Sequence, residues 1–453
     1  MNTSFFGELL ASISEQGRAL LTTRIGRKTD MPLVELCEAL LSGRGEASGV
    51  AFAAQILEGY EALSAAEREE FFRALLEDFS ADINGVLLAA RELEETPDDH
   101  GIVRRLHTVS EPRRQELIRR LNRAPGGTRA LVRMRSDLLD LLPLHPGLRD
   151  VDRDFEHLFS SWFNRGFLVM KHIDWSTPAS ILEKIIKYEA VHEIEDWEEL
   201  RRRTGLEDRR LYAFFHPALV DDPLIFVEVA LTREMPDAIA PILAKDRKLV
   251  EGSKANTAVF YSISNCQKGL RGISFGNFLI KQVVEDLQRE LPALKRFVTL
   301  SPVPGFVRWV MQDLTSKDGA ARPLLTPDLQ DRLELDGWWE DEDLAKTLHP
   351  VLISLCAHYL TRERDRKGRL RDPVARFHIG NGARLERINW PGDLSGNGIA
   401  QSYGLMVNYL YDLRFIEKNH EAFAATGAVA ASSAVTKQAR SVPDNKQAVP
   451  AAT

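Results

Sequence analysis

Residues 257–303, TAVFYSISNCQKGLRGISFGNFLIKQVVEDLQRELPALKRFVTLSPV, decide the fold of the central part of the chain. The run at 257–264 is rich in β-branched and aromatic residues, which predicts a strand. Apolar residues then recur at helical spacing over 276–291, and 296–301 reads as a second strand before two prolines. Strand, loop, helix and strand in this order predict a βαβ-like unit.

The loop between the first strand and the helix has the composition of an anion site. Its sequence, QKGLRGISFGN at 267–277, contains three glycines together with Lys268 and Arg271. Glycines let backbone N–H groups approach an anion closely, and the start of the following helix adds positive potential. Neither the dinucleotide pattern GxGxxG nor the P-loop pattern is present, so an ordinary glycine-containing turn is the alternative interpretation.

The N-terminal third, residues 1–160, is predicted to be an all-α helical bundle. Apolar residues recur three and four positions apart, and charged residues are interleaved with them as on a solvated helix face. Ser64 with Glu67 forms a capping-box pattern, and Ser110 reads as another helix start. The sequence APGG at 124–127 should separate two helices. Few residues here suggest chemistry, so we expect this third to serve folding or assembly.

Residues 161–420 mix strand and helix patterns and are predicted to form a second, mixed domain. Further strands are expected at 223–232, 374–379, 384–390 and 403–412, and a helix at about 341–362. Residues 421–453 are rich in Ala and Ser and have little apolar surface to bury, which predicts a disordered tail. The expected fold class is therefore α+β, with an all-α bundle followed by a mixed α/β domain.

Composition excludes several classes of partner and site. The 453 residues carry 59 Lys+Arg against 66 Asp+Glu, a net charge of −7 that gives no general affinity for nucleic acid or anionic membrane. Apolar runs are strand-sized, and the first residues lack the pattern of a secretory signal. Cys37, Cys266 and Cys356 are far apart with no CxxC pair, which favours a reducing compartment over disulfides or a cysteine zinc site. These features predict a soluble, cytoplasmic protein.

Three longer stretches carry a more specific signal. Residues 216–232, 262–310 and 377–413 resemble the malonyl-CoA decarboxylase family in order and spacing, above all in the blocks SPVPGF and FHIGNGA. The helical first third also resembles the N-terminal domain of that family. The resemblance implies a catalytic domain with the fold of the GCN5-related acetyltransferases (GNAT), and conversion of malonyl-CoA to acetyl-CoA and CO₂ without a metal or organic cofactor. It also implies a homotetramer assembled through the helical domain.

The resemblance assigns roles to particular residues. Ser301 matches the catalytic serine of the family and His378 its histidine; they lie 77 positions apart, so only the resemblance pairs them. Ser274 stands where some relatives carry glutamate and where the acetyltransferase pyrophosphate loop usually has its first glycine. The positions expected to bind malonyl-CoA are Ser262, Lys268, Arg271, Gly272, Ile273, Ser274, Phe275, Gly276, Asn277 and Tyr411.

The expected chemistry needs proton transfer and stabilisation of an enolate. We expect His378 to donate the proton to C2, and Ser301 to hydrogen-bond to His378 and to the malonyl group. A hydrolytic dyad is disfavoured because the nucleophile-elbow pattern GxSxG is missing, and His349 with His358 lacks the HExxH context of a zinc site. Two other functions stay open: a CoA-dependent acyltransferase on the same fold, and a non-catalytic acyl-CoA-binding sensor.

Overall fold

The computed structural model describes residues 31–42, 45–273, 279–317 and 319–443. The chain divides into two compact units. The first comprises Met1–Lys171, Phe214–Ile225 and Asn265–Gly276, and the second comprises His172–Ala213, Phe226–Ser264 and Asn277–Thr453. The first unit therefore takes up two later stretches of chain in addition to the N-terminal helices.

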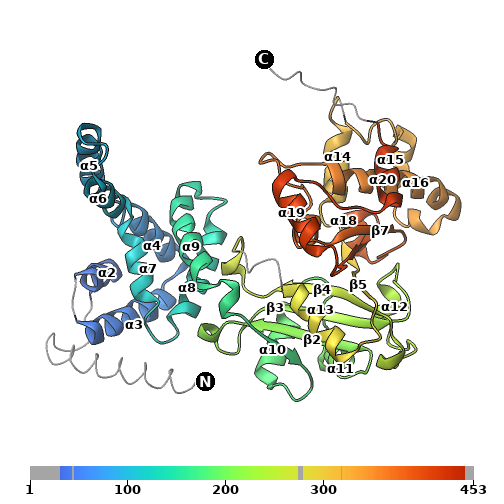
Figure 1. The fold of residues 1–453 in the computed structure, drawn as a ribbon, viewed down its shortest axis with the longest axis horizontal. Helices are drawn as coiled ribbons and strands as arrows, with labels where there is room; N and C mark the ends of the chain where they lie inside the picture. Colours follow the sequence, from blue (N-terminus) through green and yellow to red (C-terminus); the bar gives the residue numbers. More distant parts are fainter. Residues whose placement is uncertain (1–30, 43–44, 274–278, 318, 444–453) are drawn as a thin grey trace. The chain divides into compact units, whose positions relative to one another are not determined.

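The described part of the first unit consists mainly of α-helices, of which α5 and α6 form a hairpin (Figure 1). The helices are α2 Leu33–Leu41, α3 Glu46–Ala62, α4 Ala65–Glu77, α5 Ile83–Glu95, α6 His100–Ser110, α7 Arg113–Leu121, α8 Gly127–Leu141 and α9 Arg149–Trp162. The capping box at the start of α4 is confirmed, since the Ser64 N–H donates to Glu67 Oε2 at 2.8 Å and the Glu67 N–H donates back to Ser64 Oγ at 3.4 Å. The break at 124–127 is also confirmed, because Gly126 has a φ of +71° at the N-cap of α8. The prediction that Ser110 starts a helix is wrong: Ser110 ends α6, and α7 begins after Pro112.

The sheet contains eight strands in the order β1-β2-β3-β4-β5-β8-β6, with β7 paired to β8. Their bounds are β1 Val169–Ile173, β2 Arg209–Phe215, β3 Pro223–Thr232, β4 Thr257–Asn265, β5 Arg296–Thr299, β6 Ser301–Pro302, β7 Arg384–Asn389 and β8 Met406–Leu410. The helices of the second unit are α10 Ala179–Tyr188, α11 Trp197–Thr204, α12 Ala240–Leu243, α13 Leu279–Glu290, α14 Phe306–Leu314, α15 Pro327–Leu333, α16 Glu342–Arg362, α17 Pro373–Gly380, α18 Gly396–Ser402, α19 Ile416–Thr426 and α20 Ser433–Arg440. The predicted α+β class, a helical region followed by a mixed-sheet domain, is confirmed.

The predicted βαβ-like unit is confirmed and positions the candidate site. β4 pairs with β5 in parallel from Thr257↔Arg296 to Phe260↔Thr299, and α13 connects them. α13 buries a stripe of Leu, Ile and Val side chains. The last contact with β4 is the hydrogen bond from the Leu300 N–H to the carbonyl oxygen of Phe260 at 3.0 Å, and the chain continues only along β8, with Ser301 opposite Val407. The candidate serine thus lies where two neighbouring strands separate.

The prediction of a strand at 374–379 is wrong, because these residues form α17. Asp372 caps this helix: its carboxylate accepts hydrogen bonds from the N–H groups of Val374 at 2.9 Å and Ala375 at 2.8 Å. Pro373 occupies the first helical position, where its missing N–H costs nothing. A capping residue followed by proline therefore outweighs the strand-like side chains that come after it.

The prediction of disorder from residue 421 is wrong up to residue 443. α19 runs through Thr426 and α20 follows, and Val435 and Val442 are buried. Ser432 caps α20, and its hydroxyl donates to the carbonyl oxygen of Glu386 at 2.8 Å. Alanine is the best helix former and is small enough to pack closely, so an Ala-rich composition is compatible with order here. Residues 444–453 lie outside the described part of the chain.

Within the described ranges, no helix is both long and apolar enough to cross a lipid bilayer.

Candidate active site

The structure brings Ser301 and His378 together. Ser301 in β6 is 6 % exposed and His378 in the last turn of α17 is 3 % exposed. Ser301 Oγ lies 3.2 Å from His378 Nε2, within hydrogen-bond distance. Residues 77 positions apart are thus held as a buried pair by a strand end and a helix end.

The other ring nitrogen of His378 is held by a tyrosine from the strand edge. His378 Nδ1 lies 2.8 Å from the hydroxyl of Tyr411, whose backbone N–H donates to Phe297 O at 2.8 Å. The imidazole also stacks on Tyr409, with ring centroids 4.7 Å apart and an interplanar angle of 25°. His378 and Tyr409 are both buried. The imidazole ring is therefore fixed in position and in orientation.

Thr299 sets the direction of the hydrogen bonds. The Ser301 hydroxyl donates to Thr299 Oγ1 at 2.9 Å, and the N–H of Tyr409 donates to the same oxygen at 3.1 Å. Because Ser301 has one proton and gives it to Thr299, Nε2 of His378 must donate to Ser301 Oγ. Nδ1 then accepts from Tyr411, whose proton is firmly held because burial raises its pKa well above the usual value. The chain of bonds aims an N–H at Ser301.

The protonation state of His378 follows from its surroundings. Burial lowers the pKa of His378 to about 3, so the imidazole is neutral at pH 7 in the free protein. An anionic group that entered this pocket would reverse the effect, because an opposite charge at close range favours the imidazolium form. The site can therefore take up a proton together with an anionic ligand.

This burial makes a testable prediction about acid stability. The unfolded chain binds a proton at His378 near pH 6.5, whereas the folded chain does so only near pH 3, so the free energy of unfolding falls as pH decreases through this window. Between pH 7 and pH 5, the free energy of unfolding of a His378→Asn protein should fall by about 2 kcal/mol less than that of the wild type, as measured by urea unfolding. Asp372, whose pKa burial raises to about 6, contributes with the opposite sign, so only the comparison of the two proteins isolates His378. Equal losses in both would contradict the buried neutral imidazole.

Thr299 is predicted to be a positioning residue. Thr299→Val removes the acceptor for the Ser301 hydroxyl and the Tyr409 N–H, so turnover should fall about tenfold with little change in KM. Thr299→Ser keeps the oxygen and should restore most of the activity, which a purely packing role of the methyl group would not predict. Steady-state kinetics of the two variants with malonyl-CoA make the comparison.

Ser262, an expected ligand-binding residue, is committed to a carboxylate in the described structure. Its hydroxyl donates to both oxygens of Glu189 at 2.8 Å, and Ser264 donates to the same carboxylate at 3.1 Å. Glu189 also accepts the N–H groups of Val191 and His192, both at 2.8 Å. No sequence signal marks Glu189, because its role arises only where the end of α10 meets β4 in the folded chain.

The first half of the expected CoA loop is bound to the helices of its own unit. Lys268 forms an ion pair with Asp140, and Arg135, itself 1 % exposed, donates to the carbonyl oxygens of Gly269 at 2.9 Å and Arg271 at 3.0 Å. A Cβ on Gly269 would lie 1.9 Å from the carbonyl oxygen of Val132. Gly269 is therefore required by its contact with α8, a reason that the sequence did not show.

The second half of this loop is only partly described. Gly272 has a φ of +85°, which favours glycine, and Ile273 is buried. The side chain of Arg271 is exposed and forms no ion pair with the described residues. Ser274, Phe275, Gly276 and Asn277 lie outside the described residues.

A metal site would need several ligand side chains close together among the described residues. Among them no group of three or more His, Cys, Asp or Glu side chains is placed to hold a metal ion. His349 and His358 do not meet: the ring of His358 stacks on Trp309 and faces Glu363 at 3.4 Å, while His349 contacts Trp390.

Family models match most of the chain. Residues 166–449 match the malonyl-CoA decarboxylase C-terminal domain, and residues 79–163 match the malonyl-CoA decarboxylase N-terminal domain. Among curated proteins, the mitochondrial malonyl-CoA decarboxylase of Anser anser anser is 36 % identical over 459 residues, covering 94 % of this chain and 89 % of that protein.

Solved structures agree with this assignment. The crystal structure of malonyl-CoA decarboxylase from Rhodopseudomonas palustris is 55 % identical, with a TM-score of 0.86 over 89 % of this chain and 98 % of that one. The enzyme from Agrobacterium vitis is 56 % identical, with a TM-score of 0.84 over 90 % of this chain and 99 % of that one. The expected family is confirmed: this chain belongs to the malonyl-CoA decarboxylases.

Proposed function

We propose that this protein is a carboxy-lyase that converts malonyl-CoA to acetyl-CoA and CO₂ at the Ser301–His378 pair. Membership of the family supports the overall reaction. The observation that carries the mechanism is the buried His378 Nε2, which faces Ser301 Oγ at 3.2 Å in a site that keeps the free imidazole neutral.

The reaction consumes one proton, and His378 is the group that would supply it. The negative charge of the malonyl carboxylate favours protonation of the imidazole on binding. Loss of CO₂ then leaves the bonding electron pair on C2, delocalised onto the thioester oxygen as an enolate. Hydrogen-bond donors stabilise this charge, among them the Ser301 hydroxyl once it rotates from Thr299 Oγ1 toward the ligand, and the imidazolium gives its proton to C2. Burial also strips water from the carboxylate, which favours departure of neutral CO₂.

The CoA portion would be held away from the reacting carbon by the loop at 271–277. Arg271 offers an exposed guanidinium that forms no ion pair with the described residues, and the loop precedes helix α13 in the chain. Binding energy from the pyrophosphate can position the thioester without being part of the bond that breaks.

The decisive experiment is incubation with malonyl-CoA alone, in the presence of a chelator. Equal release of CO₂ and acetyl-CoA, unchanged by the chelator, is expected if no metal or organic cofactor takes part. A CoA-dependent acyltransferase would need an amine acceptor before acetyl-CoA disappears, and an acyl-CoA sensor would bind malonyl-CoA and leave it intact. Either result would refute the proposal.

Assembly into a homotetramer through the helical unit is part of the proposal. The helices α5 and α6 expose large apolar side chains, with Ile83 60 %, Leu87 52 %, Leu88 59 % and Val103 46 % exposed. Apolar side chains gathered in this way on one helical hairpin commonly mark a protein–protein interface. Light scattering at micromolar concentration should give four times the mass of the chain, and Leu87→Lys with Leu88→Lys should dissociate the assembly. A monomeric wild-type protein would contradict this.

A cytoplasmic location is also proposed. The three cysteines are free and buried, as is usual in a reducing compartment. In that setting the reaction would serve malonate catabolism or the control of malonyl-CoA in fatty acid metabolism. Cell fractionation tests the location, and recovery of the protein in a membrane or secreted fraction would refute it.

A further inference from the structure

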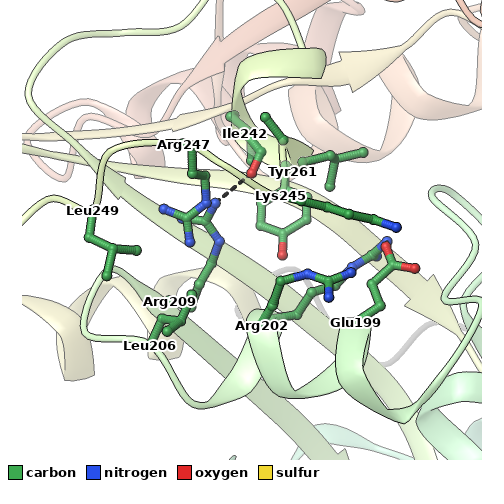
Figure 2. Close-up of a pocket in the computed structure, with 12 residues that line it drawn as sticks. Glu199, Arg202, Leu206, Arg209, Ile242, Lys245, Arg247, Leu249 and Tyr261 are labelled. Carbon is green, nitrogen blue, oxygen red and sulfur yellow. Dashed lines mark hydrogen bonds and ion pairs between the residues drawn. The ribbon is translucent and has the colours of Figure 1, made fainter.

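A second, strongly basic cavity lies in the sheet-bearing unit, where the end of α11 meets the start of β2 (Figure 2). It is small, with a volume of about 40 Å³, which is room for a few water molecules or one small ion. Its lining contains the cations Arg202, Arg203, Arg209, Lys245 and Arg247, with Glu199 as the carboxylate of the lining. Apolar side chains and the ring of Tyr261 form the remaining wall.

Three of these five cations have anionic or carbonyl partners. Arg203 pairs with Glu199 and, at 3.4 Å, with the buried Glu228. Arg247 donates through both terminal nitrogens to Asp208. Arg209 donates to the carbonyl oxygen of Ile242 at 2.6 Å and lies 3.5 Å from a carboxylate oxygen of Asp208, and burial lowers its pKa.

The other two cations are not neutralised. Arg202 and Lys245 form no hydrogen bond or ion pair with the described residues. Both also line a wider cavity that adjoins the first one, so a ligand could reach them from solvent. In the smaller cavity the five cations are opposed by Glu199 in the lining and by Asp208 and Glu228 behind it, which leaves Arg202 and Lys245 without an ion-pair partner there; the other carboxylates near these two, Glu189, Glu193, Glu195 and Asp393, line the wider cavity.

One residue that lines the same cavity, Arg203, also has a buried hydrogen-bond donor without a partner among the described residues. Arg203 is 4 % exposed, and its Nε has no hydrogen-bond partner among the described residues. A buried donor without a partner is costly, by about 1–3 kcal/mol, and is uncommon in folded proteins. An oxyanion in the cavity would satisfy both this donor and the two unpaired cations.

The cavity is separate from the Ser301–His378 pair. Side chains alternate between the two faces of β4. Tyr261 and Val259 point into the cluster that contains Ile242, on the side of the cavity. The neighbouring Phe260 points the other way, and its ring contacts Tyr411 with centroids 6.2 Å apart. The cavity and the catalytic pair therefore lie on opposite faces of the sheet.

We propose that this cavity binds a small dianion of the phosphate type, either inorganic phosphate or the phosphate group of a small ester. Two charges on the ligand match the two unpaired cations, and the forked guanidinium of Arg202 suits a tetrahedral oxyanion. The wider cavity that adjoins it offers room for a short organic remainder of an ester. This site is additional to the proposed malonyl-CoA site and does not depend on it.

The test is calorimetric titration of the full chain with inorganic phosphate, at constant ionic strength set by chloride. Saturable binding is expected, and Arg202→Ala combined with Lys245→Ala should weaken it at least tenfold. Arg289→Ala is the matched control, because Arg289 is an exposed arginine of α13 whose ion pair with Asp286 lies outside the cavity. Arg202→Gln alone is a second variant, expected to weaken binding to a smaller degree, should the double variant fold poorly.

Further arms separate the outcomes. Tighter binding of glycerol phosphate than of inorganic phosphate would identify an ester as the ligand, and weaker binding would identify the free ion. Absence of saturable binding, or equal binding by wild type and the double variant, would overturn the proposal. Displacement of phosphate by malonyl-CoA would overturn the claim of a separate site. Malonyl-CoA turnover is measured in parallel, so a failure here is distinguishable from a failure of the proposed decarboxylation.

Discussion

Replacing His378 by asparagine should lower the turnover of malonyl-CoA by about a hundredfold to ten-thousandfold, the range that a general acid contributes. Asparagine can still hydrogen-bond to Ser301 but cannot carry a proton to C2. Ser301 and His378 are both buried and lie 3.2 Å apart. Bulk water therefore has little access to the pair and should not replace the imidazole as proton donor. Single-turnover release of CO₂ measures the effect on chemistry, and binding of a malonyl-CoA analogue that cannot lose CO₂ measures affinity.

Tyr411→Phe is the matched control for this variant. It keeps the ring that packs in the site but removes the hydroxyl at 2.8 Å from Nδ1, so the imidazole loses its fixed tautomer and keeps its proton-transfer capacity. A loss smaller than that of His378→Asn is therefore expected. Full turnover by the asparagine variant would remove His378 from the mechanism.

Gly269→Ala should strongly destabilise the protein. The added Cβ would lie 1.9 Å from the carbonyl oxygen of Val132 and 2.8 Å from its carbonyl carbon, and backbone atoms cannot move aside as a side-chain end can. We expect a loss of about 3 kcal/mol or more, at the upper end of single-residue effects. A thermal melt should show a fall of at least about 6 °C, given the usual shift of about 2–4 °C per kcal/mol for large domains.

Gly147→Ala is the control for the glycine prediction. A Cβ at position 147 would meet no atom within 4 Å, and its backbone is not in the left-handed region. The melting temperature of this variant should stay within about 1–2 °C of wild type, since surface changes usually lie within about 0.5 kcal/mol. If Gly269→Ala were equally mild, the segment would not pack against α8 as described.

Strong local patterns in the sequence predicted much of the fold. The strand, helix and strand over 257–303 could be found because β-branched runs and a helical stripe differ in period. α17 could not, because the cap formed by Asp372 and Pro373 competes with a strand-like run and the outcome depends on the burial of the whole segment. The helices α19 and α20 were not predicted, because the segment is rich in Ala and Ser and only a few apolar residues pack these helices against the rest of the domain.

The candidate site was predictable only in part. Ser301 and His378 could be named from a family resemblance, but their contact depends on how α17 packs near β8. Thr299 and Glu189 carried no sequence signal, because a buried threonine and a glutamate at a helix end are common. Their roles arise from partners that lie between 2 and 110 positions away in the sequence.

The contact between α8 and the loop after β4 also has a consequence for synthesis. Arg135 and the carbonyl of Gly269 that it binds are 134 residues apart in the chain. At about 5–20 residues per second, a ribosome needs roughly 7–27 s to extend the chain from one to the other. During that time the guanidinium of Arg135, which is buried in the folded protein, lacks its two carbonyl acceptors, Gly269 and Arg271. Resistance of the nascent N-terminal region to protease should therefore appear only after the loop has left the ribosome, well after its own helices have been made.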